Sequence, residues 1–202
     1  MSGCSCAEEA VGLERRTLVI LLAINGAMFL AEAVAGWVAE STALLADSLD
    51  MLADAAVYGI ALYAVRRSGR AKRTAASMSG VLQIVLGLGV LAEVIRRIVF
   101  GSEPASLLMI GGGCVALVAN LICLQLISKH RDGGVHMRAS WIFSKNDVIA
   151  NTGVIVAGLL VMALGSRVPD LVVGSIVVVV VVRGGILILR DAVRDERASE
   201  SL

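Results

Sequence analysis

The sequence predicts an all-α membrane protein, a single bundle of six transmembrane helices, and three observations support this fold class. The chain of 202 residues is 57% hydrophobic and only 17% charged, with a mean hydropathy of +0.85. That is far above what a soluble domain of this size buries. Apolar windows with room for about 20 residues each recur along nearly the whole chain. The loops between them are short, so no segment is left for a separate soluble domain.

The windows lie at about residues 17–38, 42–65, 75–99, 105–128, 139–165 and 169–190. They divide the chain into a cytoplasmic N-terminal tail (1–16), a six-helix membrane domain (17–190) and a short cytoplasmic C-terminal tail (191–202). A transmembrane barrel does not fit, because barrel strands alternate polar and apolar residues, whereas 176–182 is continuously apolar.

The basic residues predict the orientation of the bundle. With a cytoplasmic N-terminus, thirteen Lys and Arg side chains fall on the cytoplasmic side and only Arg96, Arg97 and Arg167 on the other. This asymmetry predicts that both termini are cytoplasmic. The first window is not expected to be a cleaved signal peptide, because its apolar run is too long and contains Asn25 and Glu32. Short loops favour a bacterial inner membrane.

Polar side chains in the first and fourth windows are expected to face the bundle interior. Asn25 and Glu32 are seven residues apart and share one helical face. Asn25 and Asn120 suit interhelical hydrogen bonding as well as they suit a functional role. Glu32 points more strongly to function, because a carboxylate in hydrocarbon is costlier than an amide.

The second window contains three carboxylates, Asp47, Asp50 and Asp54. Spacings of three and four residues place them in one stripe about 10 Å long. At about 2.5–3.5 kcal/mol for each charge at mid-membrane, three bare aspartates would cost about 7–10 kcal/mol. The stripe therefore predicts a cation among the aspartates, and Lys145, the internal lysine, cannot neutralise all three.

The third window follows a basic segment, 66–73, which is predicted to be a cytoplasmic loop. Residues 87–92 match a dinucleotide-binding fingerprint by letters alone, but no strand precedes them. The glycines Gly87 and Gly89 are instead expected to let helices approach closely. Near the outer end, Glu93 is expected to pair with Arg96 and Arg97.

The fifth window begins with a second polar group, in which Ser144, Asp147 and Asn151 share one face. Asp147 lies about 12 Å and Asp54 about 16 Å from the cytoplasmic ends of their windows, so the two helices can bring them into contact. His130 and His136, just before this window, are expected to be solvated loop residues. The sixth window, a Val/Ile-rich run with Arg183 inside it, is expected to be a packing or lipid-facing surface.

The four cysteines do not predict a disulfide framework, because two lie in the N-terminal tail and two in one apolar helix. Cys4 and Cys6 could bind a soft metal ion and transfer it to the rest of the protein. Two thiolates on a tail supply at best half of a metal site, so the interpretation without a metal-binding role is preferred.

These positions together resemble the cation diffusion facilitator family of divalent-metal/proton antiporters over residues 15–195. The resemblance rests on residues 44–54, on Asp147 with 153–155, and on Asn25, Glu32 and Asn120. It implies a tetrahedral mid-membrane metal site in which Asp50 and Asp54 form the pair from the second helix. Asp147 is then the aspartate from the fifth helix.

Two departures from the family pattern stand out. Phe143 occupies the position where the family has His or Asp, so the fourth ligand stays open between Asn151, Ser144, Asp47 and water. The family usually has a cytoplasmic C-terminal domain that helps dimerisation, and this chain stops shortly after the sixth window. A homodimer is therefore expected to form through membrane helices.

The expected function is proton-coupled efflux of ions such as Zn²⁺, Mn²⁺, Fe²⁺ or Co²⁺. Carboxylate and amide oxygens are hard ligands and favour Mn²⁺ or Fe²⁺. The expected partners are the metal ion, protons and the lipid bilayer, with no nucleic acid. The metal is the substrate, so neither a resident cofactor nor enzymatic activity is expected.

Two other functions are open. A small multidrug or organic-cation/proton antiporter would use Glu32 as its essential carboxylate, but 3% aromatic residues are few for binding organic cations. A degenerate, non-transporting metal-sensing partner would explain Phe143.

Overall fold

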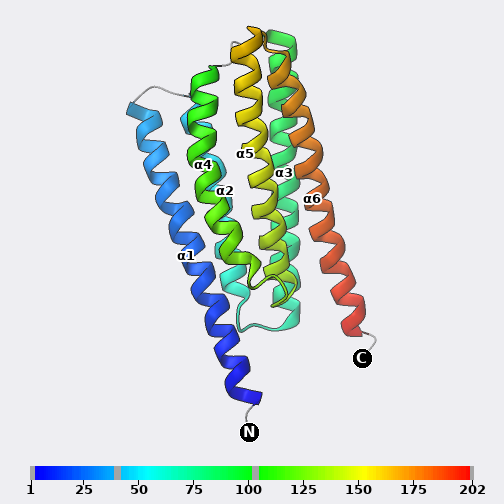
Figure 1. Ribbon diagram of the computed structural model, residues 1–202. Coiled ribbons are helices and arrows are strands. Elements are labelled where there is room, and N and C mark those ends of the chain that lie inside the picture. The colour runs from blue at the N-terminus through cyan, green and yellow to red at the C-terminus, as the bar shows by residue number, and fades with distance from the viewer. Residues whose placement is uncertain (1–2, 39–41, 102–104, 201–202) are drawn as a thin grey trace.

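The computed structural model describes residues 3–38, 42–101 and 105–200, and within these ranges it does not describe the side chains of 3–10, 32, 35–38, 42–49 and 200. The described residues form six helices (Figure 1): α1 (Gly3–Val38), α2 (Thr42–Ala64), α3 (Gly69–Phe100), α4 (Ser106–Ser128), α5 (Val135–Leu164) and α6 (Val168–Glu200). The predicted all-α membrane fold is confirmed. By length and composition, α3 to α6 each qualify as membrane spans in this part of the chain.

The helices extend beyond the predicted windows at the end of the bundle that is predicted to be cytoplasmic. Both α1 and α6 continue through most of the predicted tails, and both chain ends lie at the lower end of the bundle in Figure 1. The prediction of a loop at 66–73 is wrong for its second half, since α3 begins at Gly69. The Ser68 hydroxyl accepts a hydrogen bond from the Ala71 N–H at 3.4 Å and caps this helix.

The prediction of a solvated His136 is also wrong. His136 lies in the first turn of α5 and is only 1% exposed. Hydropathy does not detect this burial, because the helix begins before its apolar window does.

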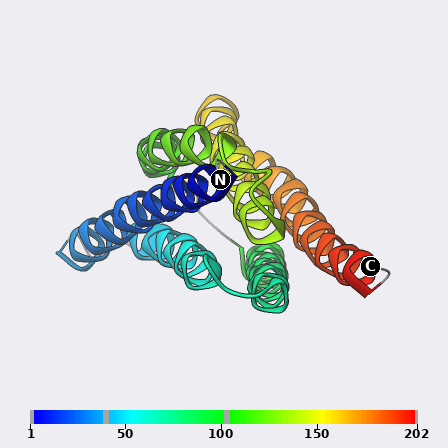
Figure 2. The ribbon, with the colours of Figure 1, turned by 90° about the horizontal axis from the view of Figure 1, so that it is seen from below.

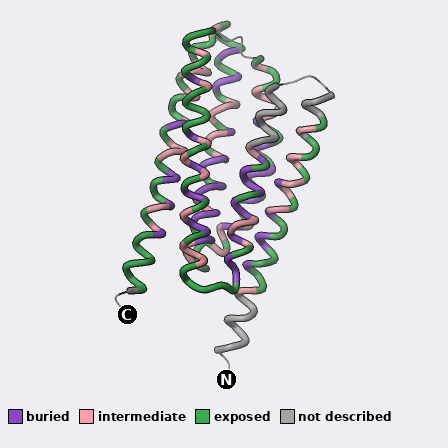
Figure 3. Tube along the Cα trace, turned by 180° about the vertical axis from the view of Figure 1, so that it is seen from behind, coloured by how far each residue is buried: buried purple, intermediate pink, exposed green. Residues whose placement is uncertain are grey.

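Helices adjacent in space form three pairs, α1 with α2, α4 with α5, and α3 with α6. Helix α5 also contacts α2, α3 and α6, and it lies near the middle of the bundle when viewed from below (Figure 2). Buried segments concentrate on the inward faces of the helices (Figure 3). Large apolar side chains such as Val85, Leu88 and Val179 are exposed on the outside, as expected for lipid-facing surface.

Close backbone contact joins α3 to α6. A Cβ at Gly185 would lie 2.8 Å from the Gly80 carbonyl oxygen, and a Cβ at Gly87 would lie 2.8 Å from Val182 Cγ2. The packing prediction is therefore confirmed for Gly87. It is wrong for Gly89, which has no such neighbour within 4 Å.

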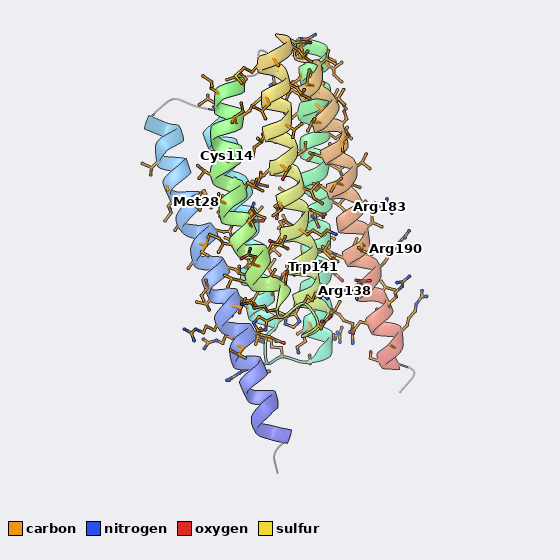
Figure 4. All side chains as sticks on the ribbon, viewed as in Figure 1. Met28, Cys114, Arg138, Trp141, Arg183 and Arg190 are labelled. Carbon is orange, nitrogen blue, oxygen red and sulfur yellow. The ribbon has the colours of Figure 1, made fainter. Side chains whose placement is uncertain are left out.

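Helix α6 is not uniformly apolar on its outer face. Arg183 and Arg190 point away from the bundle (Figure 4), and both are exposed. The prediction that α6 is a packing surface holds for its inner face, where Gly185 and Ile188 are buried.

Candidate functional site

Helices α2 and α5 bring Asp54 and Asp147 together in the middle of the bundle. Asp54 is fully buried and Asp147 is 6% exposed. Their carboxyl groups lie close enough to interact electrostatically. The carboxyl group of Asp50, one turn from Asp54, lies within the same range of both. The predicted contact between the aspartates of the second and fifth helices is therefore present in the fold.

Tyr58 belongs to the same polar cluster, and sequence reasoning missed it. Its side chain is fully buried, and its hydroxyl lies near Asp54, Ser144 and Asp147. The signal was available, because Tyr58 follows Asp54 by four residues and so shares its helical face.

A cavity of about 390 Å³ lies beside this cluster. Asp50, Asp147 and Asn151 line it, together with Phe143 and Gln83. Asp54 and Ser144 are buried and are not among the residues that line the cavity.

The cavity leads from the aspartates toward the outer end of the bundle. Its wall on α3 runs from Gln83 to Arg97, about 21 Å at 1.5 Å per residue. Most of the wall between these residues is apolar, with Val90 and Val94 from α3 and Val177 from α6. A hydrated ion entering from the aspartates would therefore meet few polar groups before the outer end.

An ion-pair network closes the outer end of the wall. Glu93 accepts hydrogen bonds from Arg96 at 2.7 Å and from Arg97 at 2.9 Å, which confirms the pairing predicted from sequence. Arg97 also donates to Asp170 of α6 at 2.7 Å. Sequence reasoning missed this second partner, because 73 residues separate the two side chains.

Several buried polar atoms around the cluster lack a hydrogen bond of ordinary geometry within the described residues. They include both carboxylate oxygens of Asp54, one oxygen of Asp147, the amide nitrogen of Asn151, the hydroxyls of Tyr58 and Ser144, and both amide atoms of Asn120 and of Gln83. Polar groups buried in an apolar surrounding cost free energy unless they find partners. This concentration is what a site for a polar or charged ligand requires.

The aspartates are neighbours rather than a formed coordination sphere. Within the described part of the chain, no three His, Cys, Asp or Glu side chains converge closely enough to hold a metal ion. Further oxygen ligands from amides, hydroxyls or water would have to complete such a site.

Of the remaining predicted residues, the side chains of Asn25 and Asn120 are described by the structure, whereas those of four others are not. Asn25 is fully buried and donates to the Leu21 carbonyl oxygen at 3.0 Å and to Cys123 Sγ at 3.4 Å, which supports a structural role between α1 and α4. Asn120 is fully buried on α4. The side chains of Glu32, Asp47, Cys4 and Cys6 lie outside those that the structure describes.

Lys145 does not join the aspartates. Its ammonium group lies 5.5 Å from the centre of the Trp141 ring, and the side chain is exposed. Lys145 therefore lies on another face of α5 than the buried Asp147 and does not pair with the aspartates.

Residues 18–195 match the family model described as the cation efflux transmembrane domain. The chain belongs to the cation efflux family. This match includes every residue of the polar cluster and of the cavity wall, and it confirms the resemblance to the cation diffusion facilitators. The family transports ions and is not a family of enzymes.

Named relatives are about one-quarter identical to this chain over the aligned residues. The zinc transporter ZitB of Yersinia pseudotuberculosis is 25% identical over 190 residues, 88% of this chain and 61% of its own length. The metal cation efflux system protein CzcD of Cupriavidus metallidurans is 26% identical over 175 residues, 81% of this chain and 55% of its own length. A cadmium, cobalt and zinc/H(+)-K(+) antiporter of Bacillus velezensis is 26% identical over 200 residues, 92% and 64% respectively. The chain thus matches little more than half the length of these relatives.

Proposed function

We propose that this cation efflux protein moves divalent metal ions out of the cytoplasm across a bacterial inner membrane, in exchange for protons. The observation that carries the proposal is the buried meeting of Asp54 and Asp147 beside Asp50, at the inner end of a cavity that leads to the outer side. Bare carboxylates at this depth are costly, and a divalent cation offsets that cost.

The proposed ligands are Asp50, Asp54, Asp147 and the amide oxygen of Asn151, with Ser144 and Asp47 as further candidates. Oxygen ligands of this kind favour Mn²⁺ or Fe²⁺ and accept Zn²⁺ or Co²⁺. The printed names of the relatives, which include zinc, cadmium and cobalt, support a substrate among the divalent transition metals.

Exchange against protons follows from the chemistry of the ligands. A metal ion binds deprotonated carboxylates, so its arrival releases any protons that the empty site holds. Protons that enter from the outer side would in turn displace the metal. The relative from Bacillus velezensis, named as an antiporter that uses H⁺, supports this coupling.

Alternating access is proposed to occur by rocking of the α3–α6 pair against α4 and α5. Support comes from the packing, because the glycine contact between Gly80 and Gly185 holds α3 and α6 together, whereas the cavity separates both from α4. Closing this cavity would shut the outer path. A homodimer through membrane helices is part of the proposal, and the mass of the detergent-solubilised protein tests it.

Metal flux in proteoliposomes with a pH dye inside tests the proposal. Asp54→Asn and Asp147→Asn should each lower the initial rate of Mn²⁺ or Zn²⁺ uptake, and the coupled pH change, by at least about tenfold. Asp132→Asn, in the exposed cytoplasmic loop, is the control and should transport like the parent. Parent-like flux in both site variants would refute the site. Metal binding without flux in the parent would favour the non-transporting sensor, and flux of organic cations alone would favour the multidrug exchanger.

A further inference from the structure

We propose that Gln83 of α3 supplies a further amide oxygen to the metal ion beside that of Asn151, at the side of the site where Phe143 provides no ligand. The inference rests on the proposed metal transport and extends its ligand set to a third helix. Gln83 and Phe143 line the same cavity as Asp50 and Asp147.

The burial of Gln83 has no explanation in the packing of the helices. The side chain is 1% exposed, and neither its amide oxygen nor its amide nitrogen has a hydrogen-bond partner among the described residues. An unpaired amide in a membrane helix costs free energy that leucine at the same position would avoid. The amide is therefore expected to have a partner that arrives from the cavity.

Gln83 lies at about the depth of Asp50 and Asp147. At 1.5 Å per residue it is about 21 Å from the cytoplasmic end of α3, as Asp50 is from that of α2, and Asp147 is about 18 Å from that of α5. The glycine contacts at Gly80 and Gly87, about one turn to either side, hold α3 against α6 at this level. The position of Gln83 along the cavity wall is thereby set by backbone packing.

The chemistry of an amide suits the missing ligand. Three carboxylates already exceed the charge of a divalent ion, so a fourth anionic ligand would add repulsion, whereas an amide oxygen adds a hard donor without charge. The amide nitrogen, which would still be unpaired, can donate to a neighbouring carboxylate oxygen and orient it. Because α3 moves with α6 in the proposed rocking, a ligand on α3 would also connect metal binding to that motion.

Calorimetry and thermal unfolding of the detergent-solubilised protein with Mn²⁺ and Zn²⁺ test the assignment. Gln83→Leu should weaken Mn²⁺ binding on the order of tenfold or more, while the unfolding temperature without metal stays equal or rises. Gln83→His supplies an imidazole and should shift the preference toward Zn²⁺ on the order of tenfold. The matched control is Gln125→Leu, which changes an exposed glutamine on α4 and should bind both metals like the parent.

The outcomes separate this inference from the proposed function. If the parent binds Mn²⁺, Asp147→Asn does not, and Gln83→Leu binds with parent affinity, the role of Gln83 is refuted and the transport proposal stands. A purely structural Gln83 would instead lower the unfolding temperature of the metal-free leucine variant and leave the metal preference of the histidine variant unchanged, and this result also refutes the role. If the parent binds no divalent metal, the proposed function fails first.

Discussion

Arg97 of α3 and Asp170 of α6 form an ion pair of 2.7 Å at the outer end of the cavity whose inner wall holds Asp50 and Asp147. The same two helices touch through Gly80 and Gly185, in the half of the bundle that holds both chain termini. Helices α3 and α6 are therefore joined at two levels, and the cavity lies along the side that faces α4 and α5. Each level can be disrupted separately.

Loss of the outer ion pair should destabilise the protein. Arg97→Gln leaves Asp170, which is 13% exposed, without its guanidinium partner. After allowance for solvent screening we expect a loss of about 1 kcal/mol, seen as a drop of about 2–4 °C in the unfolding temperature in detergent. Arg96→Gln is the matched control, because it removes an exposed Arg whose ion pair among the described residues is with Glu93. Equal unfolding temperatures for both variants would show that the contact with Asp170 contributes nothing.

Overpacking at Gly185 should separate α3 from α6. A Cβ there would lie 2.7 Å from Ile84 Cγ1 and 2.8 Å from the Gly80 carbonyl oxygen. Since backbone cannot yield as a flexible side chain does, Gly185→Ala should cost about 1–3 kcal/mol, measured by thermal unfolding in detergent. At Gly89, also helical but without such a neighbour within 4 Å, alanine should be neutral or slightly stabilising. A neutral Gly185→Ala would contradict the close packing seen here.

Glu14, in the segment of α1 that precedes its predicted membrane window, should make stability depend on pH. Burial raises the pKa of this carboxyl group, although the nearby Lys72 and His130 oppose the rise. A carboxyl group with a raised pKa in the folded state contributes stability below its unfolded pKa, and this contribution is lost as pH rises through the folded pKa. Glu14→Gln keeps the shape without the charge, so it should raise the unfolding temperature above that pKa by about 1–3 °C and flatten its pH profile.

The Glu14 carboxylate packs directly on Gly133, where a Cβ would overlap it. Asp132→Asn, which changes the adjacent but 93% exposed carboxylate, is the control for the change of charge in this loop. A pH profile that is the same for Glu14→Gln and the parent would show that the burial of Glu14 is not coupled to folding.

Restoring a ligand at position 143 should strengthen metal binding. Phe143 is 1% exposed and lines the cavity one turn before Asp147. Phe143→His places an imidazole there and should tighten Zn²⁺ binding by about tenfold or more in calorimetry. Phe143→Leu removes the ring without adding a ligand and should bind Zn²⁺ like the parent. Equal affinities in the two variants would place the metal ion away from this position.

Hydropathy and periodicity predicted much of the site. The aspartates of the second and fifth windows were expected to meet at similar depth, and Asp54 and Asp147 do so. Tyr58 and the partner of Arg97 were missed for different reasons. Tyr58 has a largely apolar ring, so its hydroxyl does not stand out in a membrane helix. Asp170 is distant in sequence from Arg97, and only the antiparallel packing of α3 and α6 brings the two together.

The sequence by itself determined the all-α class and the helical bundle, because hydrocarbon requires long apolar helices. Its asymmetric basic residues predict the orientation of that bundle. It also predicted Asp50, Asp54 and Asp147 as site residues, since charge in hydrocarbon is too costly to be incidental. Only the tertiary structure decided which helices pair, that Gly87 packs and Gly89 does not, and that Gln83 faces the cavity with Phe143. The physical reason is that hydropathy reports the preference of each residue for the membrane, whereas the rotation and register of a helix depend on packing against its neighbours.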